Sequence, residues 1–200
     1  MMFESEFIKG LFQNAIFFLD EAISYINRGV SDRRNMILAI INMQISMELA
    51  LKSSLATNFG LRTILVEKQA NLSEKELQRL YEENNLKIKE YDSLKNFLKT
   101  PQGNFEAYNF EKPQYKYMER FQKYRNRILH SSYVFSNDEI QQMESDLIYV
   151  LIHILGVILS DRTDEEYRTF VQEYLNSREY SKLLKNSVYN KELQIFLQEE

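Results

Sequence analysis

The stretch MILAIINMQISMELALKSSLA, residues 36–56, decides the fold. It is apolar almost all round a helix, and its only regular polar positions are Gln44, Glu48 and Lys52, each four residues from the next. A helix that is apolar on nearly every face is buried among other helices. The sequence therefore predicts a central helix over 33–58.

Outward from this segment, apolar residues recur at three- and four-residue steps, the spacing typical of amphipathic helices. Capping residues and the loop signals Gly and Pro indicate where the helices end. The predicted helices cover 4–27, 33–58, 74–84, 87–99, 114–131 and 137–160, with a loop over 100–113 and two or three short helices over 162–200. No stretch alternates in the manner of a β-strand.

We therefore predict an all-α fold with an antiparallel four-helix-bundle core. The bundle takes up residues 1–160 and includes a polar helical insertion over 60–113. Residues 161–200 are predicted to form a C-terminal helical extension.

The composition excludes several kinds of site. Cys is absent, which excludes disulfides, thiol nucleophiles and cysteine-bound metals. With only His130 and His153 there is no His-rich metal site, and without a Gly-rich stretch there is no phosphate-binding loop. We expect no signal peptide and no membrane span, since the longest apolar run, 147–159, is too short. The expected location is cytoplasmic.

The segment 111–130, EKPQYKYMERFQKYRNRILH, is basic, although the whole chain has a net charge of −4. Six basic and two acidic residues give it 6 − 2 = +4. A basic helix with interleaved aromatic residues suits a phosphate backbone and stacked bases, and we predict Lys116, Arg120 and Lys123 as RNA-binding residues. The alternative is that the cations are solvated and that the apolar side chains form a core face, namely Tyr117, Met118, Phe121 and Ile128.

Helix phase singles out Arg125. It falls in the apolar sector that Met118, Phe121 and Ile128 define, where a cation needs a carboxylate, a phosphate or a wet interface. His130 lies about 140° from Arg125 at 100° per residue. Three explanations stay open for one shared site: a distorted helix end, the reach of the arginine, or a second copy of the chain.

Arg125 to His130 reads R-N-x-x-x-H, and Glu48 to Lys52 reads E-L-A-L-K. These stretches resemble the R-x4-H signature and the apolar second helix of HEPN-domain proteins, many of which are metal-independent ribonucleases. The resemblance covers about residues 5–58 and 114–160. Some HEPN toxins carry a Tyr two residues after the His, whereas Tyr133 stands three residues after it here.

The resemblance implies an endoribonuclease, a toxin or phage-defence effector, that cleaves RNA through the 2′-OH and leaves a 2′,3′-cyclic phosphate. His130 suits proton transfer and Arg125 suits phosphate, while Asn126 holds a phosphate oxygen or orients His130. Arg127, Tyr133 and Glu48 are the supporting residues. Glu48 either directs Arg125 or forms a surface pair with Lys52.

No metal or cofactor is expected. The expected partners are RNA, a second copy of the chain with the site at the dimer cleft, and an antitoxin protein. Two other functions stay open: a non-catalytic HEPN-like bundle that binds a partner protein or a nucleotide, and an unrelated helical adaptor.

Overall fold

The computed structural model describes residues 2–100, 110, 112–130, 135–156, 158, 176–186, 189–191, 194, 195 and 198. Within these residues every named element is a helix. They are α1 (Met2–Arg28), α2 (Arg33–Phe59), η1 (Leu61–Thr63), α3 (Glu67–Ala70), α4 (Glu74–Glu82), α5 (Tyr91–Leu98), α6 (Lys112–His130), α7 (Asn137–Val150), η2 (Leu151–Leu155) and α10 (Arg178–Leu183). The predicted all-α class is confirmed.

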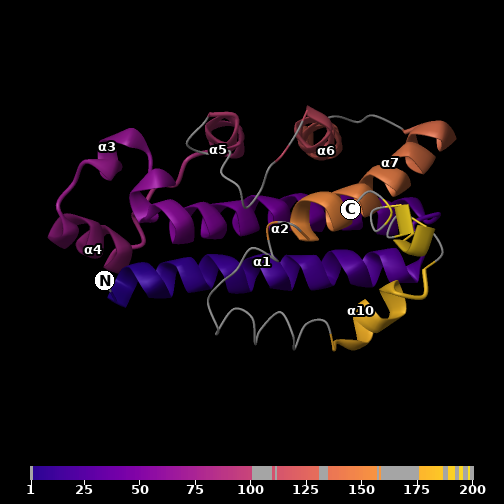
Figure 1. Ribbon diagram of the computed structural model, residues 1–200, viewed down its shortest axis with the longest axis horizontal. Coiled ribbons are helices and arrows are strands. Elements are labelled where there is room, and N and C mark those ends of the chain that lie inside the picture. The colour runs from indigo at the N-terminus through magenta and orange to yellow at the C-terminus, as the bar shows by residue number, and fades with distance from the viewer. Residues whose placement is uncertain are drawn as a thin grey trace.

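The two longest helices, α1 and α2, run antiparallel along the length of the molecule (Figure 1). Small buried residues let them approach closely, and the Ser46 hydroxyl donates a hydrogen bond to the Ala15 carbonyl at 2.7 Å. Asp32 is the N-cap of α2, since its side chain accepts from the Arg34 amide at 2.7 Å. This pair confirms the helices predicted over 4–27 and 33–58.

By length and composition alone, α2 is apolar enough to cross a membrane, and it is the one such helix in the part of the chain that the structure describes. More than half of its most apolar window is buried inside the protein, and the core helix of a soluble protein passes the same test. The cytoplasmic location therefore stays a prediction.

Two of the later helices, α5 and α6, lie on the other side of α2 from α1. In Figure 1, α5 and α6 are seen nearly end-on above α2, so they cross α2 and do not run antiparallel to it. The four-helix-bundle core therefore stays a prediction. α6 buries Met118 and Phe121 completely, which confirms this part of its predicted core face. α10 of the C-terminal extension packs against α1.

The single helix predicted over 137–160 has a different form in the described residues. A capping box at Ser136 and Glu139 opens α7 as predicted, but the α-helix ends at Val150 and passes into the π-helical turn η2. His153 within η2 is buried and stacks on Tyr149 with ring centroids 4.3 Å apart.

The start of the helix predicted over 87–99 is also different. Lys89 donates its amide to the Ile64 carbonyl at 2.8 Å, and Val66 donates to Lys87 at 3.0 Å. These bonds form an isolated antiparallel bridge around Leu65, so residues 87–89 are extended. α5 therefore begins only at Tyr91.

Candidate functional site

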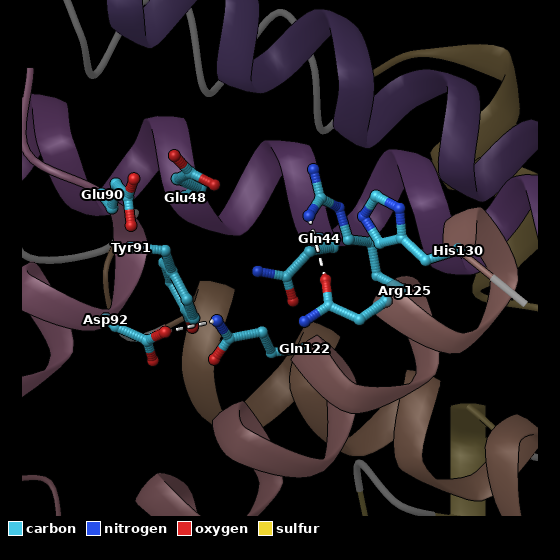
Figure 2. Close-up of a pocket in the computed structure, with 9 residues that line it drawn as sticks. Gln44, Glu48, Glu90, Tyr91, Asp92, Gln122, Arg125 and His130 are labelled. Atoms are coloured by element: carbon cyan, nitrogen blue, oxygen red, sulfur yellow. Dashed lines mark hydrogen bonds between the residues drawn. The ribbon is translucent and has the colours of Figure 1, made fainter.

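One polar cavity of about 530 Å³ lies where α2, α5 and α6 meet. The side chains that line it come from all three helices and from the residue before α5 (Figure 2): Gln44, Glu48, Glu90, Tyr91, Asp92, Gln122, Arg125, Asn126 and His130. Its volume lies within the range of roughly 300–1,000 Å³ found for small-molecule and cofactor sites. The three residues predicted to be catalytic, Arg125, Asn126 and His130, are therefore brought together.

Helix phase predicts that Arg125 lies in the apolar sector of its helix. In the structure its side chain instead lines this polar cavity. Its Nη1 donates a hydrogen bond to Asn126 Oδ1 at 3.0 Å. Within the described residues no carboxylate is within 4.0 Å of its guanidinium, the limit for an ion pair. The cation thus keeps most of its hydrogen-bonding capacity for a ligand.

His130, the last residue of α6, lines the same cavity with an exposed side chain. In the view of Figure 2 its imidazole and the Arg125 guanidinium lie toward the same end of the cavity. α6 stays helical through His130, so no distorted helix end is required. Of the three explanations for a shared site, the length of the arginine side chain is the one that applies within a single copy of the chain.

Glu48 lines the cavity from α2, but its carboxylate accepts a hydrogen bond from Lys52 rather than from Arg125. The alternative of an i, i+4 pair is therefore confirmed, and the direct link from Glu48 to Arg125 is wrong. Lys52 is largely buried, so the pair also serves to neutralise a cation on the central helix.

A hydrogen-bonded triangle links α5 and α6 beside the cavity, and two of its members, Asp92 and Gln122, line it. Lys95 Nζ contacts Asp92 Oδ1 at 2.9 Å and donates to Gln122 Oε1 at 3.0 Å, and Gln122 Nε2 donates to Asp92 Oδ2 at 3.0 Å. The hydrogen bonds from Lys95 and Gln122 lower the pKa of Asp92. These contacts hold the start of α5 against α6.

Two buried polar groups in the wall have no hydrogen-bond partner among the described residues: Gln44 Oε1 and the Tyr91 hydroxyl. Gln44 is 3% exposed and Tyr91 is 4% exposed. Burial, followed by the charges of Glu48 and Asp92, raises the pKa of Tyr91 well above its usual range. The neighbouring Gln44 side chain acts in the opposite direction and lowers this pKa. Tyr91 therefore keeps its proton at neutral pH.

The other predicted residues on α6 lie outside the cavity lining. Arg120 contacts the buried carboxylate of Asp146 at 3.0 Å, so it has a structural role that the sequence did not reveal. Arg127 pairs with Glu139 at 2.9 Å, which links α6 to the start of α7. Lys116 and Lys123 are exposed on α6.

Tyr133, the last predicted supporting residue, lies outside the described residues. Among those that are described, no group of three or more Asp, Glu or His side chains is arranged to hold a metal ion.

Sequence reasoning missed the part of the cavity that the insertion supplies, namely Glu90, Tyr91 and Asp92, and missed the amides Gln44 and Gln122. One signal was available. The polar stripe on the central helix begins at Gln44, and a buried polar stripe needs a polar surface opposite it. Nothing in the sequence pattern connects that stripe to α5.

Comparison of the chain with models of protein families, with curated proteins and with solved structures finds no match. The chemistry of the cavity is therefore the basis for assigning a function.

Proposed function

We propose that the chain is a metal-independent endoribonuclease of HEPN type, acting as a toxin or phage-defence effector. The observation that carries the proposal is that one helix brings a cation without a carboxylate partner and an imidazole to the same cavity. The R-N-x-x-x-H resemblance agrees with this placement.

In the proposed reaction, neutral His130 takes the proton from the ribose 2′-OH. The 2′ oxygen attacks the adjacent phosphorus, the bond from phosphorus to the 5′ oxygen breaks, and the leaving oxygen takes a proton from a general acid. The products are a 2′,3′-cyclic phosphate and a 5′-OH. Proton transfer of this kind contributes about 10²–10⁴-fold to a rate.

Arg125 has the geometry to stabilise the charge that develops on the phosphate oxygens, since its planar fork matches two of them. Asn126 accepts one hydrogen bond from the guanidinium and so limits its orientations. Asn126 is thus a positioning residue in this proposal. A second copy of the chain across the site would supply the general acid, which is why we include a homodimer in the proposal.

The test is cleavage of a mixed-sequence RNA in the presence of EDTA. His130→Ala and Arg125→Ala are each expected to lower the cleavage rate by about 100-fold or more. The matched control is Arg79→Ala, which removes a mostly exposed arginine on α4 whose one ion pair within the described residues is with Glu83. Circular dichroism of each variant checks that it is folded.

Equal cleavage by the wild-type protein and both site variants would overturn the proposal. The absence of any cleavage, together with no growth arrest when the wild-type chain is expressed, would favour the second candidate. This is a non-catalytic helical protein that binds a nucleotide or a partner protein. The observation that favours it is the net charge of −4, which disfavours extended contact with an RNA backbone.

A further inference from the structure

The cavity is electrically divided. In the view of Figure 2, Glu48 and Glu90 lie toward one end, Arg125 and His130 lie toward the other, and Gln44 lies between. A phosphate is attracted to the cationic end and repelled from the carboxylates. A nucleotide with its phosphate at Arg125 therefore places an uncharged portion, the base, toward the acidic end.

We define the acceptor wall as Gln44, Glu48, Glu90 and Tyr91. Gln44 Oε1 is buried without a partner, Glu48 uses Oε1 for Lys52 and keeps Oε2, and Glu90 makes no ion pair within the described part of the chain. The Tyr91 hydroxyl is likewise buried without a partner, and it retains a proton to donate. The acceptor wall thus offers several hydrogen-bond acceptors and one hydrogen-bond donor, the Tyr91 hydroxyl.

Buried polar groups in folded proteins are almost always satisfied. Two such groups, on residues of α2 and α5 that line one cavity, therefore indicate a ligand with complementary groups. Among the RNA bases, guanine alone presents two adjacent donors, N1–H and the N2 amino group, beside one acceptor, O6. Uracil presents one donor between two acceptors, which an acceptor-rich wall disfavours.

We propose that the acceptor wall binds the guanine base of the nucleotide whose 3′-phosphate lies at Arg125, so that the enzyme cleaves after guanosine. The carboxylate and amide oxygens accept from N1–H and the N2 amino group, and the Tyr91 hydroxyl donates to O6. This inference deepens the proposed ribonuclease function and assigns the insertion, through Tyr91 and Glu90, a role in substrate choice.

The first test measures binding without cleavage, by calorimetry with nucleoside 3′-monophosphates. The 3′-monophosphate of guanosine is expected to bind about 10-fold or more tightly than that of uridine, in line with the discrimination of a paired donor set. The inosine compound, which lacks the N2 amino group, is expected to bind more weakly than the guanosine compound.

Three variants test whether the acceptor wall determines the preference for guanosine. Tyr91→Phe and Glu48→Gln are expected to reduce the preference for guanosine at least several-fold. Glu90→Gln lies at an exposed position and serves if the Glu48 variant fails to fold. Tyr25→Phe on α1, outside the cavity lining, is the matched control and is expected to keep the preference.

The second test maps the ends of the RNA fragments, which are expected to carry guanosine 2′,3′-cyclic phosphate. RNA cleavage without preference for guanosine, and equal binding of the four monophosphates, would overturn the base assignment and leave the ribonuclease proposal standing. Selective binding of the guanosine compound without any cleavage would support the wall and overturn the ribonuclease. A preference for adenosine or cytidine would also overturn the assignment to guanine.

Discussion

Asp146 fixes α6 against α7, and its removal tests this part of the fold most directly. The residue is 1% exposed. Its carboxylate accepts from Arg120 Nη1 at 3.0 and 3.1 Å, from the Tyr124 hydroxyl at 2.7 Å and from Gln142 Nε2 at 2.7 Å. Asp146→Ala therefore leaves three donors without their acceptor, and one of the three is a cation.

The expected cost follows from these contacts. Breaking a buried ion pair costs about 3–5 kcal/mol of the free energy of unfolding. The Arg120 side chain is 30% exposed, so water solvates part of the freed guanidinium and the lower end, about 3 kcal/mol, applies. At roughly 2–4 °C per kcal/mol for a chain of this size, the melting temperature falls by about 6–12 °C.

Urea denaturation followed by circular dichroism measures this cost. Glu144→Ala is the matched control, because it removes a carboxylate from the same helix that makes no hydrogen bond or ion pair with the described residues. It should change stability by less than about 0.5 kcal/mol. Tyr124→Phe should cost about 1.5 kcal/mol in the wild type and almost nothing in the Asp146→Ala background, since the charged acceptor is then gone. Equal costs for Asp146→Ala and Glu144→Ala, or additive costs in the double variant, would refute this reasoning.

Three further predictions concern stability. Tyr91→Phe removes a buried hydroxyl without a partner and should raise the free energy of unfolding by about 1 kcal/mol, measured by urea denaturation; a loss of stability would show that the hydroxyl is satisfied. The pKa values of Tyr91 and Tyr124 are raised from 10.0, in both cases chiefly by burial, so the stability they contribute is fully present below about pH 10 and is lost as the pH rises through the folded-state values. Thermal melts between pH 8 and 12 should therefore show a steep fall that is shallower in the double Tyr→Phe variant. Ser136→Ala removes the capping box of α7 and should cost about 1 kcal/mol in urea, whereas an unchanged midpoint would show that the cap is dispensable.

The helices and their ends were largely predictable, because the signals that specify them are local. Asp32 accepts from a backbone amide two residues away, and Ser136 forms its capping box with a residue three positions on. Apolar spacing likewise predicted the buried positions of α1, α2 and α6. Where a nonlocal contact competes with local propensity, the prediction was wrong, as at residues 87–89, which pair with the backbone around Leu65.

The residues of the candidate site also differ in whether a local sequence signal identifies them. Arg125, Asn126 and His130 share one short motif, so the sequence alone pointed to them. Arg120 is also an arginine on α6, but its role depends on Asp146, which is 26 residues away in the sequence. No local pattern reveals which cation a buried carboxylate will take.

By itself, the sequence determined that the chain is helical, where most helices begin and end, and which helix carries the basic motif. These properties depend on contacts between residues a few positions apart. Only the tertiary structure decided that the start of α5 closes the cavity beside Arg125, and that two buried polar groups there have no partner. The physical reason is that a cavity is formed by side chains from α2, α5 and α6, whose relative positions follow from packing between helices and not from the periodicity of any one of them.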